Sequence, residues 1–158
     1  MAYTDSYFAG DLNDWKSTSG YVFLLAGGAV SWASKKQPVV TLSTTEAEYI
    51  VAASCACQYI WLMKLLKKLG HKGKDGSIMY CDNSSTIQLS KHSVFHGKSK
   101  HIDVKFHFLR DLVNEGTVKL KYCNTHNQIA DIMTKPLKKE QFIKLREMLG
   151  LMSAIEVS

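Results

Sequence analysis

Four acidic residues stand among apolar neighbours at separate points of the chain, and they are the side chains best suited to chemistry: Asp5, Glu48, Asp82 and Asp131. One such acid is ordinary. Four of them at the ends of separate elements predict convergence on hard cations, because carboxylates without His or Cys ligands suit Mg²⁺ or Mn²⁺. Two ions of this kind can activate water and stabilise the leaving oxygen of a phosphodiester.

Each acid also has a structural explanation. Asp5 fits a turn residue, Asp82 fits a helix N-cap, and Asp131 fits a salt-bridge partner of a nearby lysine. These explanations have the same weight as the metal-binding ones when the residues are taken singly. The case for chemistry therefore depends on the four acids meeting in space.

Glu48 is the most unusual of the four because it lies on the apolar side of an expected helix, four residues before Ala52. Ser43 and Glu46 fit an S-x-x-E capping box, which places Glu46 off the buried side. A carboxylate turned toward a core needs a charged partner, either a basic side chain or a metal ion. The alternative is that Thr45 is the N-cap and Glu48 its box partner.

The elements that must position these acids follow from the periodicity of apolar residues and from turn residues. Strands are predicted at residues 2–8, 20–26, 29–35, 77–82 and 117–123, with a tight hairpin at Gly27-Gly28. Helices are predicted at residues 41–70, 83–89, 101–116, 127–135 and 139–149. Three antiparallel strands and a helix, followed by strand, two helices, strand and helices, indicate an α/β domain with a mixed five-stranded sheet. Asp82, at a junction of strand and helix, lies where α/β folds place ligands.

Composition narrows the class of protein. The chain has 158 residues, 46% of them hydrophobic, which predicts a single domain over 1–158 with its core at about 3–151 and a disordered tail at 152–158. No apolar run is expected to reach membrane-span length, and the acidic, polar N-terminus is unlike a signal peptide, so we expect an intracellular protein with no membrane partner. A net charge of +6 favours a polyanionic partner. Four cysteines without C-x-x-C spacing predict reduced packing residues.

Five blocks of sequence carry a resemblance to a known family. In order, they are YTDSYFAGD with STSGYVF, LSTTEAEY, YCDNSS, the HxxxKHIDVKFHFLRD stretch from His96, and QIADIMTKPL. They resemble the ribonuclease H domain of the Pol polyprotein of copia-type LTR retrotransposons, over residues 3 to 151. The resemblance implies the ribonuclease H fold, with sheet order 3-2-1-4-5 and helices on both faces. It places the family's metal-binding acids on Asp5, Glu48, Asp82 and Asp131, and so favours Glu48 over Glu46.

The resemblance also implies an activity. It points to a metal-dependent endonuclease that hydrolyses the RNA strand of RNA/DNA hybrids during reverse transcription, with two Mg²⁺ ions, or Mn²⁺ in their place. The implied partners are the hybrid and the reverse transcriptase domain of the same polyprotein, with a monomeric isolated domain in cytoplasmic virus-like particles or in the nucleus. The alternative is a catalytically inactive nucleic-acid-binding or structural module. All four acids are intact, which favours the enzyme.

Further residues are implicated around the acids. Cellular relatives carry a histidine on the loop before the last acid that is thought to help product leave, and His126 lies in that loop, which is shorter here. The basic loop KHSVFHGKSK stands where some relatives insert a basic handle, and it offers phosphate contacts, although a purely solvated loop is the alternative. Its candidate side chains are Lys91, Lys98 and Lys100. Polar groups near the acids are expected to read 2′-hydroxyls and phosphates in the minor groove: Thr44, Thr45, Asn83 and Ser84.

Overall fold

A computed structural model describes residues 1–71, 76–92 and 100–152 of the chain. Its strands are β1 (Ala2–Tyr7), β2 (Thr18–Leu25), β3 (Gly28–Lys36), β4 (Ser77–Cys81) and β5 (Val118–Tyr122). Its α-helices are α1 (Thr44–Lys68), α2 (Ser84–Leu89), α3 (Lys100–Asn114) and α4 (Lys139–Met148). Lys98 and residues 153–158 of the expected tail lie outside the described residues.

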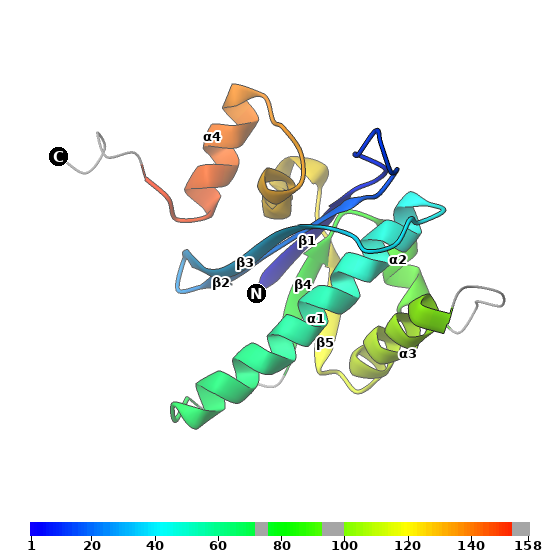
Figure 1. Ribbon diagram of the computed structural model, residues 1–158. Helices are drawn as coiled ribbons and strands as arrows, with labels where there is room; N and C mark the ends of the chain where they lie inside the picture. The colour runs from blue at the N-terminus through cyan, green and yellow to red at the C-terminus, as the bar shows by residue number, and fades with distance from the viewer. Residues whose placement is uncertain (72–75, 93–99, 153–158) are drawn as a thin grey trace.

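The five strands form one mixed sheet in the order β3-β2-β1-β4-β5. The β1–β2 and β2–β3 pairs are antiparallel, and the β1–β4 and β4–β5 pairs are parallel. Helices α1 and α3 lie over one face, and α4 lies over the other (Figure 1). The predicted fold class, strand order and two-sided helical cover are confirmed.

Two predictions of local secondary structure are wrong. The expected helix at 127–135 is a pair of short 3₁₀ helices, η1 (Thr125–Asn127) and η2 (Ile129–Met133). The hairpin turn is Ala26-Gly27 rather than Gly27-Gly28, because Leu25 pairs with Gly28 across it. Ala26 and Gly27 have φ of 51° and 84°, and two positive φ values are what a type I′ hairpin turn requires.

Helix α1 begins with the predicted capping interaction. The Ser43 hydroxyl accepts a hydrogen bond from the Glu46 N–H at 3.2 Å. The Glu46 carboxylate reaches back to the Leu42 N–H at 2.8 Å, which folds the preceding loop over this side chain. Glu46 is consequently only 2% exposed, so the expectation that it lies off the buried side is wrong.

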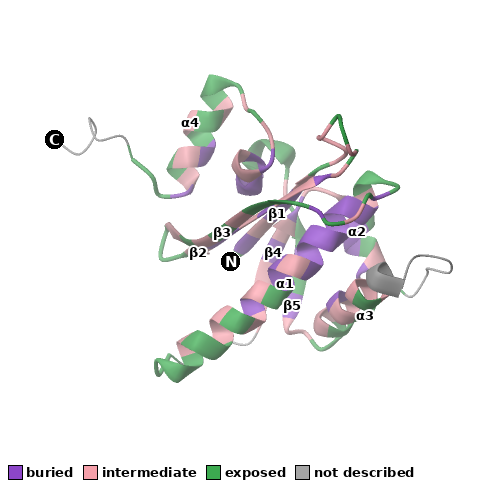
Figure 2. Cartoon of the chain, in the orientation of Figure 1, coloured by how far each residue is buried: buried purple, intermediate pink, exposed green. Residues whose placement is uncertain are grey.

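Helix α1 is buried in its first half and exposed toward its end (Figure 2). Its buried residues run from Glu46 to Tyr59. By length and composition alone α1 meets the criteria for a membrane span, contrary to the expectation that no segment does. A core helix of a soluble protein meets the same criteria, and the apolar side of α1 packs on the sheet.

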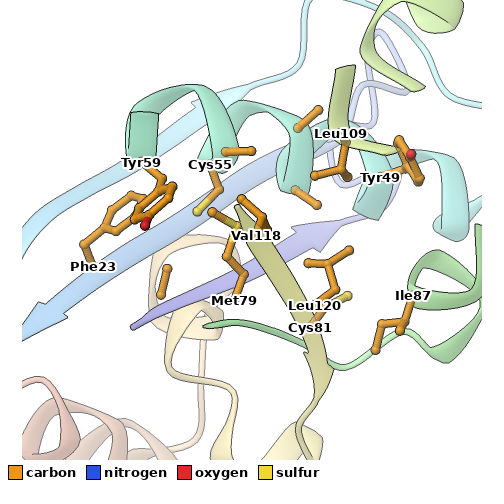
Figure 3. Packing of buried hydrophobic residues seen from close by; sticks show 14 residues of the cluster. Phe23, Tyr49, Cys55, Tyr59, Met79, Cys81, Ile87, Leu109, Val118 and Leu120 are labelled. Atoms are coloured by element: carbon orange, nitrogen blue, oxygen red, sulfur yellow. The ribbon is translucent and has the colours of Figure 1, made fainter. Parts of the chain in front are cut away.

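The larger apolar cluster joins α1 and α3 to the sheet (Figure 3). Buried side chains of α1, α3 and the sheet meet there, and they include Phe23, Tyr49, Cys55, Met79 and Leu109. The cysteines are free, as predicted, but Cys57 is exposed, so the packing role expected for all four is wrong for this one. It lies on α1 two residues beyond the buried Cys55, which turns it to another side of the helix.

A smaller cluster on the opposite face docks η2 and α4 onto β2, with Val22, Ile129 and Leu149 buried at its centre. Gly20 of β2 makes this docking possible. A Cβ atom at Gly20 would lie 2.5 Å from the Thr134 Cγ2 atom and 2.8 Å from the Met133 Cβ atom. Because Gly20 pairs with Asp5 of β1, the segment that it admits lies directly beside Asp5.

We predict that Gly20→Ala lowers the free energy of unfolding by about 1–3 kcal/mol, because the added methyl group pushes η2 away from the sheet. Gly28→Ala is the matched control, since a Cβ atom there meets nothing within 4 Å and φ is not in the left-handed region. It should change the stability by no more than about 0.5 kcal/mol. Urea denaturation of the three proteins measures this, and equal losses would show that η2 docks without the gap at Gly20.

Candidate metal centre

Three carboxylates from three separate elements meet at one end of the sheet. Asp5 is on β1 and Asp82 follows β4, and because these strands are parallel both acids lie toward the same sheet end. Asp131 joins them from η2, which is distant from both strands in the sequence. One ligand oxygen from each acid lies within 4.8 Å of those of the other two. The convergence that the spacing predicted is therefore present for these three residues.

Glu48 reaches the same site from the first turns of α1. Its ligand oxygen, the Cys81 sulfur and an Asp82 oxygen lie within 4.8 Å of one another, so Asp82 belongs to both groups. The Glu48 Oε1 atom accepts a hydrogen bond from the Ser6 N–H at 2.7 Å, and Oε2 lies 3.7 Å from the Cys81 sulfur. Burial raises the pKa of the Cys81 thiol well above its usual 9.0, which keeps it protonated at neutral pH. The available donor set is thus all carboxylate, which fits Mg²⁺ or Mn²⁺.

Threonine hydroxyls and one lysine hold the carboxylates in place. Thr134 donates a hydrogen bond to the Asp5 Oδ2 atom, and Thr125 donates one to the Asp82 Oδ2 atom at 3.1 Å. The Lys135 ammonium lies 2.9 Å from the Asp131 Oδ1 atom and 3.7 Å from the Asp5 Oδ2 atom. The salt-bridge alternative for Asp131 is therefore realised as well, and it does not exclude the metal-binding interpretation.

Two buried glutamines tie together the elements that carry the acids. Gln128 is fully buried, and its Nε2 atom donates to the Thr4 carbonyl on β1 at 2.8 Å, which links η2 to the strand of Asp5. Gln37 donates to the Ser19 hydroxyl at 2.8 Å and to the Ala47 carbonyl at 3.0 Å, which links β2 to the turn of α1 beside Glu48. Buried amides with satisfied donors fix backbone positions in this way.

Burial and mutual repulsion raise the pKa values of three of the acids. For Asp131, burial followed by the charge of Asp5 raises the pKa from 3.8 to about 6. For Glu48, burial followed by the charges of Asp5 and Asp82 raises the pKa well above 4.5. Burial also raises the pKa of Asp5, although Thr134 and Lys135 oppose this. Without a metal these three acids therefore lose their protons at a higher pH than isolated carboxyl groups do, as desolvated like charges in a cluster should.

Some of the residues expected to contact nucleic acid lie at helix starts next to the acids. Thr44 and Thr45 begin α1, Asn83 and Ser84 begin α2, and the Thr86 hydroxyl joins the two helix starts by donating to the Thr45 carbonyl at 3.1 Å. Asn83 also caps α2, because its side chain accepts from the Thr86 N–H at 3.0 Å. Lys91 is exposed just after α2, and Lys100 is the first residue of α3.

His126 lies on η1 and is exposed. It directly follows Thr125, whose hydroxyl contacts Asp82, so the loop that carries it does border the site. Its backbone carbonyl accepts hydrogen bonds from Gln141 and Lys144, both at 3.0 Å. Its role in product release stays a prediction.

Several residues that shape the site were not predicted from the sequence: Gly20, Gln37, Cys81, Gln128, Thr134 and Lys135. One signal was available for Lys135, since a basic residue four positions after an acid in a helical turn is placed to pair with it. The others act through contacts between segments far apart in the chain, which periodicity does not reveal.

Two curated relatives cover almost the whole chain. The retrovirus-related Pol polyprotein from transposon TNT 1-94 of Nicotiana tabacum is 43% identical over 151 residues, which is 96% of this chain and 11% of that protein. The corresponding polyprotein from transposon RE1 of Arabidopsis thaliana is 39% identical over 150 residues, which is 95% of this chain and 10% of that protein. The chain thus spans about a tenth of the length of these relatives. No family model matches it.

Solved structures identify the fold of this chain. The N-terminal RNase H domain of a Mycobacterium tuberculosis protein superposes with a TM-score of 0.59 at 12% identity, covering 92% of this chain and 94% of that one. The chain is a ribonuclease H-like domain of the copia-type retrotransposon Pol family. This ribonuclease H-like domain also superposes on LC11-RNase H1, a structure determined in complex with an RNA/DNA hybrid, with a TM-score of 0.54 at 17% identity over 84% of this chain and 91% of that one. The predicted family is confirmed.

We predict that Glu48→Gln raises the free energy of unfolding of the metal-free domain by about 0.5–2 kcal/mol at pH 7. Single substitutions that relieve an unfavourable functional site commonly stabilise a protein by this amount. The folded pKa of Glu48 lies above 4.5, so the folded state keeps a proton that the unfolded chain releases. Stability of the parent therefore falls as the pH rises from 4.5 toward the folded pKa. Glutamine stays neutral, so its advantage should grow with pH across this range.

Glu46→Gln is the matched control, because it changes an equally buried glutamate in the same turn that caps the helix and lies outside both ligand groups. Glutamine also serves in a capping box. Thermal melts in EDTA and in Mg²⁺ at several pH values measure the effects. Mg²⁺ should stabilise the parent and Glu46→Gln alike, and Glu48→Gln less. A lower melting temperature of Glu48→Gln in EDTA would mean that Glu48 is a structural residue.

Proposed function

We propose that this domain is a metal-dependent endonuclease that hydrolyses the RNA strand of RNA/DNA hybrids. The observation that carries the proposal is the convergence of three carboxylates, from β1, from the residue after β4 and from η2, within 4.8 Å, with Glu48 beside them. Family membership supports the same activity, since the relatives are retrovirus-related Pol polyproteins. Buried like charges of this density are costly unless cations neutralise them.

The residues that would hold Mg²⁺ or Mn²⁺ are Asp5, Glu48, Asp82 and Asp131. Two bound ions supply an activated water molecule and stabilise the leaving oxygen of the phosphodiester. The two ligand groups overlap at Asp82, an arrangement that supports two ions rather than one. The protein's own part is to fix the oxygens: Thr134 orients Asp5, Thr125 orients Asp82, and the Ser6 N–H orients Glu48. Such supporting contacts set both the metal affinity and the activity of metal sites.

We predict cleavage of the RNA strand of a hybrid in Mg²⁺ or Mn²⁺, with single-stranded RNA and duplex DNA left largely intact. EDTA should abolish cleavage. Asp82→Asn should reduce the rate at least about a hundredfold, since it removes a ligand that both groups share. Asp111→Asn, at an exposed position on α3, is the control and should keep full activity. A gel assay with labelled substrates tests this. Cleavage in EDTA, or equal cleavage of all nucleic acids, would contradict the proposal, and hybrid binding without cleavage would favour the inactive module.

Hybrid binding is assigned to groups around the site. We propose that the polar side chains of Thr44, Thr45, Asn83 and Ser84, which lie at the joined starts of α1 and α2, meet 2′-hydroxyls and phosphates. Lys91, which is exposed just after α2, is proposed to add a phosphate contact, and Lys98 and Lys100 stay candidates from the sequence for the same role. The reverse transcriptase domain of the same polyprotein is the proposed source of further affinity, because this chain is a small part of its relatives.

We predict that hybrid affinity falls steeply with salt concentration, because phosphate contacts release counterions. Lys91→Ala should reduce the slope of the logarithmic salt dependence by about one. Ser84→Ala should weaken binding without changing that slope, and Lys119→Ala, on β5, should change neither. Fluorescence anisotropy titrations at several salt concentrations, with and without an attached reverse transcriptase domain, measure this. A flat salt profile would rule out the phosphate contacts.

His126 is proposed to assist product release from its exposed position on η1. His126→Ala should then slow steady-state turnover and leave the single-turnover cleavage rate unchanged. Equal effects on both rates would place His126 in the chemical step, and no effect on either would remove it from the mechanism.

A further inference from the structure

Lys135 is the side chain of the site that the proposed hydrolysis does not use. Its ammonium group lies 2.9 Å from Asp131 Oδ1 and 3.7 Å from Asp5 Oδ2. These are the two most deeply buried carboxylates of the group formed by Asp5, Asp82 and Asp131. Their side chains are 4% and 3% exposed, whereas that of Lys135 is 27% exposed. A flexible lysine stem thus enters the site from solvent and ends between two desolvated acids.

The backbone places the lysine there. The Thr134 and Lys135 N–H groups both donate to the Asp131 carbonyl, at 3.1 Å and 3.2 Å, which turns the chain after η2 back over Asp131. The Thr134 hydroxyl donates to Asp5 and so fixes the same turn to β1. Because the turn is held at both ends, the lysine side chain starts beside the two acids, within reach of their oxygens.

Charge explains what the lysine does in the absence of a metal. In the described part of the chain, Lys135 is the basic residue that pairs with these acids. Partial burial lowers its pKa, but the charges of Asp5 and Asp131 outweigh this and raise it above 10.5, so the group is a cation at neutral pH. It neutralises part of the repulsion that raises the pKa values of the acids around it.

We propose that Lys135 is an internal cation that occupies the Asp5–Asp131 half of the site in the metal-free protein and must leave these oxygens before a divalent ion binds there. The inference rests on the proposed metal-dependent function. Mg²⁺ binds oxygens at about 2.0–2.1 Å, so an ion on Asp131 Oδ1 and the ammonium group compete for the same space and the same charge. The Lys135 side chain is partly exposed, which gives the ammonium group a path to solvent.

Competition predicts a signature opposite to that of a purely structural ion pair. Loss of the lysine charge should weaken the metal-free fold and, at the same time, tighten metal binding, because the two cations are linked by mutual exclusion. A structural ion pair, once lost, lowers stability and leaves metal binding equal or weaker.

The test is calorimetric titration of Mn²⁺ and of Mg²⁺ into four proteins without nucleic acid: the parent, Lys135→Met, Lys135→Arg and Lys138→Met. Methionine keeps the stem and removes the charge, arginine keeps the charge, and Lys138 is an exposed lysine three positions farther on. Lys135→Met should bind Mn²⁺ at least roughly fivefold more tightly than the parent, the lower end of common coupling effects. Lys138→Met should match the parent, and Lys135→Arg should not exceed it. In EDTA the melting temperature of Lys135→Met should fall, and saturating Mn²⁺ should remove the difference.

The outcomes separate the inference from the proposed function. If the parent binds Mn²⁺ and Lys135→Met binds it equally or more weakly, the inference is overturned and the metal-dependent function stands. If neither protein binds a divalent ion, both fail. Binding by Lys135→Met alone, or a Lys135→Met protein that folds only when Mn²⁺ is present, supports the inference, because the metal then replaces the lysine. If methionine prevents folding under both conditions, Lys135→Gln is titrated in its place and judged by the same criteria.

Discussion

The burial of several carboxylates at one end of a sheet is the constraint on which this structure depends. Asp5, Glu48 and Asp131 are each nearly inaccessible, and their pKa values are raised because burial and mutual repulsion both oppose ionisation. Such a cluster persists only if other parts of the fold stabilise it. A domain of this size does so by burying apolar clusters on both faces of the sheet.

The scaffold holds the acids through contacts between segments that are distant in sequence. Gly20 admits η2 to the sheet, and Gln128 bonds η2 to the strand of Asp5 across 124 positions of sequence. Gln37 similarly connects β2 to the first turns of α1. Each contact fixes backbone rather than a ligand atom, so precision at the site comes from the way the elements pack. The charge of Lys135 completes the arrangement when no metal is bound.

Much of the fold and the identity of the acids could be predicted from the sequence, because both follow from local patterns. Asp82 was recognisable as an acid between a strand and a helix N-cap, and Asn83 does cap α2. The burial of Glu46 was predicted wrongly, because it depends on how the preceding loop folds back and not on helical periodicity. The docking role of Gly20 and the pairing of Lys135 with Asp5 were likewise unpredictable, because each requires knowing that η2 lies on β1 and β2.

The central claim is that these carboxylates form a divalent-metal site, and anomalous diffraction from crystals of the domain grown with Mn²⁺ tests it most directly. The account predicts Mn²⁺ density bounded by Asp5, Glu48, Asp82 and Asp131, with the ammonium group of Lys135 moved off the Asp5 and Asp131 oxygens. No anomalous density at these residues at saturating Mn²⁺, with Lys135 still bridging the two aspartates, would contradict it.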